Sequence, residues 1–274
     1  MNAERVAATV AQGVHGRRRT GQGESFWQFR PYQWGDQSGD IDWRRSARSD
    51  SLYVRETEWE AAESVWLWRD GSPSMNYSSS SNYPEKSDRA ALLLMALAAL
   101  LVRGHERTAL LGTGAPPSSG RAALIRMASE LDQSAGPAFS HYSLPRHSQL
   151  VLIGDFLSPL EELAKVFASY AAIGVRGHLL QVLDPAEEAL PFKGRVLFKG
   201  MEQEGEALFG RVEGVREAYQ TALLAHRQGL AELAASVGWT FALHHTDRPP
   251  ETALLALYQA LSETQAGLSA GMDR

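Results

Sequence analysis

An α/β fold with a mostly parallel sheet and helices on both faces is the fold class that this sequence predicts. From about residue 63 onward, short apolar runs alternate with longer segments of helical periodicity. Runs such as 150–153 (LVLI) are continuously apolar rather than apolar at every second residue, which is typical of strands covered on both sides. Strands that alternate with helices in this way favour parallel pairing.

The alternation predicts where each element lies. We expect strands at residues 64–68, 108–111, 150–153, 175–183, 195–198 and 239–244, and helices at residues 86–103, 121–132, 160–172, 211–236 and 251–263. Turn-forming residues separate these elements. Asp70, Gly71 and Pro73 follow the first strand, while Ser158 and Pro159 have the N-cap and N1 pattern that opens a helix.

The chain changes character near Glu60, which indicates a division into two parts. Residues 1–62 form a polar, aromatic and glycine-punctuated segment, whereas residues 63–274 carry the α/β pattern. The first segment is too small to build a core of its own. We therefore expect a charged and aromatic N-terminal extension, residues 1–62, packed on a main domain of residues 63–274.

Composition and charge exclude several classes of function. A net charge of −5 gives no clustered positive field for nucleic acid. The absence of cysteine removes disulfides, thiolate zinc sites, thiol nucleophiles and a lipoprotein anchor, and it suits a reducing cytoplasm. The longest apolar stretch, residues 90–102, is too short to cross a bilayer, and no export signal is visible. We expect a cytoplasmic protein that neither binds nucleic acid nor inserts directly into a membrane.

Two of the expected strands end in an aspartate. The first runs into residues 70–74 (DGSPS), a D-x-S-x-S arrangement, and another into Asp155. Because ligands of an open parallel sheet bind beyond the carboxyl ends of its strands, these side chains should lie together. Hydroxyl and carboxylate oxygens suit a hard cation that keeps some of its waters. The sequence thus predicts a Mg²⁺ or Mn²⁺ site, open to a partner's carboxylate, that is made of Asp70, Ser72, Ser74 and Asp155.

The D-x-S-x-S loop and Asp155 are also compatible with a structural or an enzymatic role. D-x-S-x-S can be turn chemistry alone, and Asp155 can cap the following helix, which would leave a purely structural domain. A Mg²⁺-dependent phosphohydrolase is the enzymatic alternative, with Asp70 as its nucleophile. Such sites usually have a second carboxylate where this chain has Ser72. They also need a lysine, for which the nearest candidates are Lys165 and Lys193.

The segment before the first strand carries a dense series of residues in order. They are Arg19, Thr20, Gly21, Gly23, Glu24, Arg30, Tyr32, Gly35, Asp36, Asp40, Ile41, Asp42, Trp43, Ala47, Arg48, Arg55, Glu56 and Glu60. Together with the strand–D-x-S-x-S–helix opening, this series resembles the bacterial domain of unknown function 58 family, a group within the von Willebrand factor A fold. The resemblance covers residues 15–160 well, and the rest through its α/β pattern. It implies a Rossmann-like von Willebrand factor A domain with a metal-ion-dependent adhesion site.

The resemblance also implies a function. Members of this family are typically encoded beside MoxR-type AAA+ ATPases and are thought to act with them as adaptors in chaperone-like assembly. We therefore expect a non-enzymatic, metal-dependent adaptor that binds such an ATPase and a client protein.

Three features depart from the best-formed metal sites of the fold. Phe156 stands where a glycine is usual, and Arg69 directly precedes Asp70. The candidates for the usual third-loop threonine are Thr113, Ser118 and Ser119.

Residues 17–60 contain as many arginines as acidic residues, so the segment is charge-dense but nearly neutral. A solvated, self-paired surface explains this composition. A docking surface explains it equally well, because arginine forks pair with carboxylates and tryptophan rings are flat apolar anchors. The candidate partner-binding residues are Arg30, Trp34, Trp43 and Arg48.

Two pairs of residues elsewhere are assigned ordinary structural roles. Trp66 and Trp68 lie on the same face of one strand and are expected to pack in the core. His244 and His245 end a strand without an obvious carboxylate partner, and we expect exposed or capping roles for them rather than ligation.

Overall fold

The computed structural model describes residues 2–14, 26–32, 41–49, 51–57, 64–133, 141–201 and 205–272. It divides into a large unit, Met1–Arg17 with Glu63–Arg274, and a small unit, Arg18–Ala62. In the small unit, β1 (Phe26–Pro31) pairs antiparallel with β2 (Tyr53–Thr57), and α2 (Trp43–Ser46) is a single turn capped by Asp42.

A five-stranded parallel sheet lies at the centre of the large unit. Its strands are β3 (Ser64–Arg69), β4 (Arg107–Leu110), β5 (Gln149–Gly154), β6 (Arg176–Leu183) and β9 (Thr240–His245). They are arranged in the order β4-β3-β5-β6-β9, and every neighbouring pair is parallel. All five carboxyl ends therefore share one edge, and the predicted α/β class with a mostly parallel sheet is confirmed.

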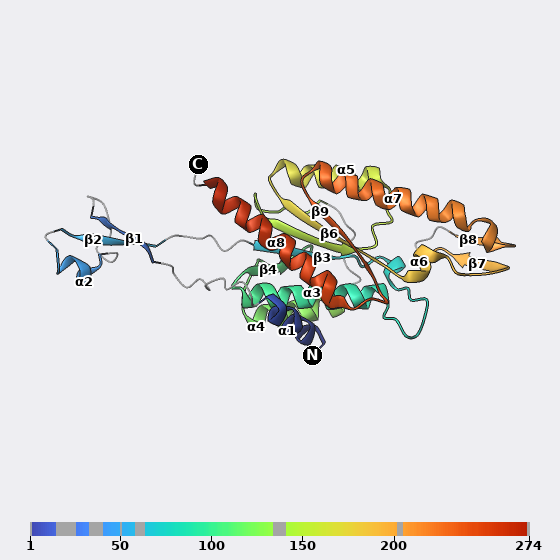
Figure 1. Ribbon diagram of the computed structural model, residues 1–274, viewed down its shortest axis with the longest axis horizontal. Helices are drawn as coiled ribbons and strands as arrows, with labels where there is room; N and C mark the ends of the chain where they lie inside the picture. Colours follow the sequence, from blue (N-terminus) through green and yellow to red (C-terminus); the bar gives the residue numbers. More distant parts are fainter. Residues whose placement is uncertain are drawn as a thin grey trace. The chain divides into compact units, whose positions relative to one another are not determined.

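Helices cover both faces of this sheet (Figure 1). One face is covered by α1 (Asn2–Val14), α3 (Lys86–Arg103), α4 (Arg121–Gln133) and α8 (Pro250–Met272), and the other by α5 (Leu160–Ala172) and α7 (Arg216–Ser236). Alternate residues of β3 supply the two cores: Val65 and Leu67 join the first, and Trp66 and Trp68 pack in the second. The expectation that both tryptophans pack in the core is confirmed.

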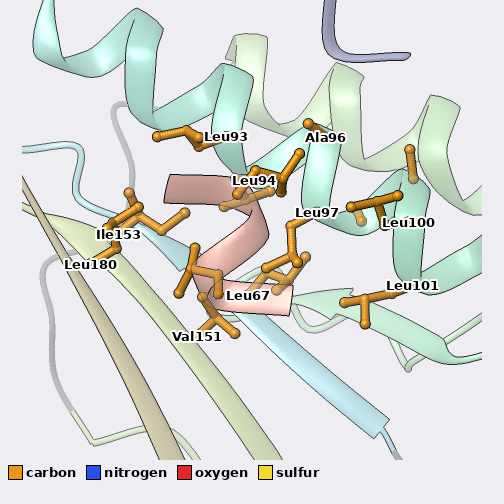
Figure 2. Packing of buried hydrophobic residues seen from close by; sticks show 14 of the residues in the cluster. Leu67, Leu93, Leu94, Ala96, Leu97, Leu100, Leu101, Val151, Ile153 and Leu180 are labelled. Atoms are coloured by element: carbon orange, nitrogen blue, oxygen red, sulfur yellow. The ribbon is translucent and has the colours of Figure 1, made fainter. Parts of the chain in front are cut away.

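The helix α3 anchors the loop that precedes it. Figure 2 shows Leu97 of α3 beside Leu67 of β3, with Val151 of β5 next to them in the same buried cluster. The bounds of α3 agree with those predicted, because its apolar residues recur with helical spacing between two arginine-bearing turns. The start of α3 is thus fixed against the carboxyl edge of the sheet.

The N-terminal helix α1 differs from the predicted division of the chain. The helix α1 belongs to the large unit, because Val6, Ala7 and Val10 are buried against α3 and α8, so the structural division does not follow the predicted 1–62 boundary. The predicted packing of the rest of the extension on the main domain stays a prediction.

Two short elements within residues 184–210 go beyond the predicted pattern. They are α6 (Pro185–Ala189) and β8 (Glu206–Phe209). The strand β7 (Val196–Lys199) is predicted, but it pairs antiparallel with β8 in a separate two-stranded sheet instead of joining the central one. Among the described helices, none has the length and apolar character that a bilayer span requires.

Candidate functional site

The loop after β3 holds the predicted D-x-S-x-S residues in a tight turn. The Asp70 carboxylate accepts a hydrogen bond from the backbone N–H of Ser72 at 2.8 Å, which is a turn that aspartate favours. A 3₁₀ turn, η2 (Pro73–Met75), follows, and its Met75 side chain is fully buried in the core. The hydroxyl oxygens of Ser72 and Ser74 consequently lie 2.9 Å apart.

The second strand-end aspartate meets this loop across 81 residues of sequence. Ser74 Oγ donates a hydrogen bond to Asp155 Oδ2 at 2.7 Å, and Gln181 Nε2 of β6 donates to the backbone carbonyl of Asp155 at 2.8 Å. Asp155 is buried. The structure therefore brings together all four residues that the sequence placed at this edge.

The close approach of the two strand ends depends on Gly154. A Cβ atom at this position would lie 2.6 Å from Asp70 Cβ and 2.9 Å from Asp70 Oδ2. The last residue of β5 must therefore lack a side chain for the Asp70 turn to keep its place beside the strand.

A lysine that the sequence pattern does not single out lies at the centre of the cluster. Lys86 is the first residue of α3, and its side chain is 0% exposed. Its Nζ donates to Asp155 Oδ2 at 2.9 Å and to Glu187 Oε1 at 2.6 Å. Burial on its own would lower the pKa of Lys86, but the two carboxylates more than offset it, so that its pKa is raised. Lys86 is therefore a buried ammonium cation between two strand ends.

Glu187 is held in place by the start of α6. Asp184 and Glu187 form a capping box: Asp184 Oδ1 accepts from the N–H of Ala186, and Glu187 Oε2 accepts from the N–H of Asp184, both at 2.8 Å. Asp184 Oδ2 also accepts from the N–H of Ser79 at 2.9 Å. The carboxyl ends of β3, β5 and β6 are thus tied together by one polar network.

The sequence carries signals for both of these additional residues. A lysine in the first turn of a helix is opposed by the helix dipole, which favours acidic residues there, so Lys86 needs a compensating partner. Residues 184–187 (DPAE) are a capping-box pattern directly after a strand. Neither signal indicates, however, that the two side chains meet, because that contact joins segments 101 residues apart.

The remaining neighbours of the loop explain two departures from the expected motif. Phe156 adopts φ 51°, a left-handed conformation that glycine adopts at lower cost, and its ring lies 6.3 Å from the ring of Trp68. Its carbonyl accepts a hydrogen bond from His226 Nε2 at 2.7 Å.

The third-loop candidates make local hydrogen bonds instead. Thr113 Oγ1 donates to the carbonyl of Leu110 in its own turn at 3.1 Å, and Ser118 Oγ accepts from Arg126.

The expected exposed or capping role is wrong for His244, and the expected lack of a carboxylate partner is wrong for His245. His244 is buried, and its Nε2 accepts from Arg89 at 2.9 Å. His245 Nε2 lies 2.6 Å from Glu188 Oε2, a carboxylate that also pairs with Arg227 at 2.7 Å. The sequence pattern misses these partners because they come from α3, α6 and α7.

A family model described as "Protein of unknown function DUF58" matches residues 28–229. The chain belongs to this family.

Relatives of this DUF58 protein occur in mycobacteria. The uncharacterized proteins Mb1516 of Mycobacterium bovis and Rv1480 of Mycobacterium tuberculosis are each 27% identical to it over 259 residues, covering 87% of this chain and 80% of theirs. Two solved structures are similar at lower identity. The conserved hypothetical protein BatB from Bacteroides thetaiotaomicron shares 15% identity over 74% of this chain and 99% of that one, with a TM-score of 0.44. An aerotolerance-related membrane protein from Bacteroides fragilis shares 19% over 73% and 99%, with a TM-score of 0.46.

The candidate partner-binding residues of the DUF58 chain belong to the small unit. Trp43 opens α2 and is 62% exposed. Arg48 lines a pocket of about 400 Å³ with Asp42, Arg44, Arg45, Ser49 and Tyr53. The Arg45 guanidinium lies over the Tyr53 ring, 5.1 Å from its centroid. Trp34 and the side chain of Arg30 lie outside the described part of the structure.

The residues of the DUF58 edge site can be compared with the needs of Mg²⁺. This ion takes near-octahedral oxygen ligands at about 2.0–2.1 Å and keeps several waters. Here the Lys86 ammonium contacts Asp155 Oδ2, so an ion bound to that oxygen would have a like charge at short range. Among the described residues, no group of three or more His, Cys, Asp or Glu side chains is placed to hold a metal. As arranged, the residues do not fit a divalent ion, and the Mg²⁺ or Mn²⁺ site stays a prediction.

Proposed function

We propose that this DUF58 protein is a non-enzymatic adaptor with a von Willebrand factor A-like domain, which binds another protein at the carboxyl edge of its parallel sheet. The observation that carries the proposal is the meeting of Ser72, Ser74 and Asp155 at that edge. Both serines are half-buried, so the hydroxyl pair borders solvent while the charges beneath it are covered.

The chemistry of the cluster favours binding over turnover. The Ser74 hydroxyl donates to an oxygen of Asp155 that also accepts from the Lys86 ammonium, so this oxygen is already engaged by two donors. The Asp70 carboxylate holds the turn through the Ser72 N–H. The alternative Mg²⁺-dependent phosphohydrolase needs Asp70 as a nucleophile and a lysine at the phosphoryl group, whereas the lysine found in the cluster faces Asp155 and Glu187.

The partner that we propose is a MoxR-type AAA+ ATPase, with which the protein would assemble or mature client proteins in the cytoplasm. This assignment rests on the family resemblance. The exposed Trp43 and the arginine-lined pocket around Arg48 support a second contact, because tryptophan and arginine are the residues that most often anchor protein interfaces.

The proposal is tested by retention of a MoxR-type AAA+ ATPase on the immobilised protein. We expect the double variant Ser72→Ala/Ser74→Ala to retain at least about tenfold less ATPase than the wild type, the loss expected when a buried hydrogen-bonded contact is removed. Ser236→Ala is the matched control, because this hydroxyl is exposed on α7 and donates to a carbonyl of its own helix.

Two results decide against the proposal. Equal retention by the double variant and the wild type removes the edge site as the docking surface. Phosphatase or ATPase activity of the purified protein that Asp70→Ala abolishes favours the phosphohydrolase instead. Retention is also measured in Mg²⁺ and in EDTA. Loss of retention in EDTA favours the metal-dependent adaptor that the sequence predicts, and equal retention favours an adaptor that needs no metal.

A further inference from the structure

We propose that the ammonium group of Lys86 takes the place of the divalent ion at the carboxyl edge of the sheet, so that the folded wild-type protein is held together there by its own cation and binds no Mg²⁺ at this site. The inference goes beyond the proposed function and does not depend on it, because it concerns the ionic structure of the site rather than the partner.

The contacts of the ammonium are those of a bridging cation. Its Nζ lies 2.9 Å from Asp155 Oδ2 and 2.6 Å from Glu187 Oε1, so one positive charge joins carboxylates from the ends of β5 and β6. The oxygen of Asp155 that it contacts is the same one that accepts from Ser74 at 2.7 Å. Lys86 therefore contacts the strand-end carboxylate oxygen, already hydrogen-bonded to the hydroxyl loop, that the sequence assigned to a metal.

The lysine is also fixed in that position. Its side chain is fully buried, and its backbone N–H donates to the carbonyl of Tyr77 at 3.1 Å. The Asp155 side chain is only 3% exposed. An entering ion would have to displace the buried ammonium from two carboxylates. This exchange would leave the Lys86 charge buried without a partner.

Removal of the ammonium should convert the site to a metal-dependent one. Without Lys86, the carboxylates of Asp155 and Glu187 face each other without a cation, and the oxygen of Asp155 also accepts from Ser74. Carboxylate and hydroxyl oxygens are ligands that Mg²⁺ and Mn²⁺ accept. The substitution Lys86→Ala is suited to this test, since alanine is a good helix former at the start of α3.

The experiment measures the thermal unfolding midpoint of the full-length protein in EDTA and in excess MgCl₂ or MnCl₂, with NaCl matched for ionic strength. We expect the wild-type Tm to be the same in all three solutions. Lys86→Ala should have a lower Tm in EDTA and regain about 5 °C or more at a Mg²⁺ concentration a hundredfold above its Kd. Adding Ser72→Ala and Ser74→Ala to Lys86→Ala should abolish this gain.

A second variant keeps the test decisive if Lys86→Ala does not fold in EDTA. Lys86→Ala/Glu187→Gln removes one charge of each sign, and its folding in Mg²⁺ against EDTA is followed by circular dichroism. Recovery that depends on Mg²⁺ supports the proposal. A wild-type Tm that rises with Mg²⁺ and loses the rise in Ser72→Ala/Ser74→Ala overturns it. The absence of any metal response in both Lys86 variants also overturns it, because the lysine would then not occupy an ion's place.

Discussion

The distance between the two strand-end aspartates is set by the residue that lies between them. Gly154 ends β5, and the Asp70 side chain fills the space that a Cβ would need. The backbone of Asp70 also continues the parallel ladder, donating its N–H to the carbonyl of Ile153 at 2.8 Å. The turn that presents Ser72 and Ser74 is therefore fitted to one small residue of the neighbouring strand.

Substitution of Gly154 tests this fit. We expect Gly154→Ala to lower the free energy of unfolding by about 1–3 kcal/mol, since the new methyl must push the Asp70 turn aside. Gly210→Ala is the control, because no atom lies within 4 Å of its added Cβ, and its effect should stay within about 0.5 kcal/mol. Urea denaturation of both variants gives the comparison; equal stabilities would show that the strand ends are not in close contact.

Two buried histidines give the protein a definite pH dependence. Burial, together with the nearby Arg176, lowers the pKa of His178 to about 4, and burial with Arg89 and His245 lowers the pKa of His244 to about 4. An unfolded histidine titrates near 6.5. Between these values the unfolded chain binds protons that the native protein does not. The resulting stability is present in full above about pH 6.5 and is lost as the pH falls towards 4.

Each histidine can contribute at most about 3 kcal/mol to this loss. In His244→Gln this titrating group is gone, so unfolding should take up about one proton less in this window. The slope of the unfolding free energy against pH should become shallower by the corresponding amount. Denaturation series at several pH values measure the slope. A variant slope equal to that of the wild type would mean that His244 is charged in the native protein or exposed.

At the scale of elements, the N-terminal helix shows why local pattern is an incomplete guide. The sequence of α1 is short, carries charged residues and has no long apolar run, so its pattern groups it with the polar extension. Its burial comes from α3 and α8, whose residues lie about 80 and 240 positions later in the chain. By contrast, α3 and α5 have strong helical periodicity of their own, and their bounds agree with the prediction.

A pair of substitutions on α1 tests its place in the core. Val10 is buried and Thr9 is exposed, so each can receive the same charge in a different setting. We expect Val10→Asp to destabilise the protein by about 3 kcal/mol or more through an unpaired buried carboxylate, and Thr9→Asp by less than about 1 kcal/mol. Thermal unfolding measures both. Similar values for the two variants would place α1 outside the core.

At the scale of the whole molecule, the sequence predicts that the site lies at the carboxyl edge of the sheet. It does not predict the polar network that the residues form there. Apolar runs ending in Asp70 and Asp155, with helices between them, are enough to bring the D-x-S-x-S loop and the second aspartate together. The ion is inferred from ligand chemistry alone. Lys86 and Glu187 enter only with the structure, because their contact depends on how α3 and α6 are placed on the sheet.

Lys86 links the carboxylates that follow β5 and β6, and Ser74 links the loop after β3 to the same oxygen of Asp155. Serine hydroxyls lie at the half-buried part of this network, and the buried Lys86 ammonium pairs with the carboxylates of Asp155 and Glu187. A partner protein would thus meet hydroxyl groups supported by an internal cation rather than an exposed metal ion.

Crystals of the wild-type protein grown in MnCl₂ test this claim most directly, since manganese is located by its anomalous scattering. We expect no anomalous peak within bonding distance of Ser72, Ser74 and Asp155. We also expect Lys86 Nζ to lie within hydrogen-bonding distance of Asp155 and Glu187. An anomalous peak bonded to the serine hydroxyls, with the lysine displaced from the carboxylates, would contradict this claim.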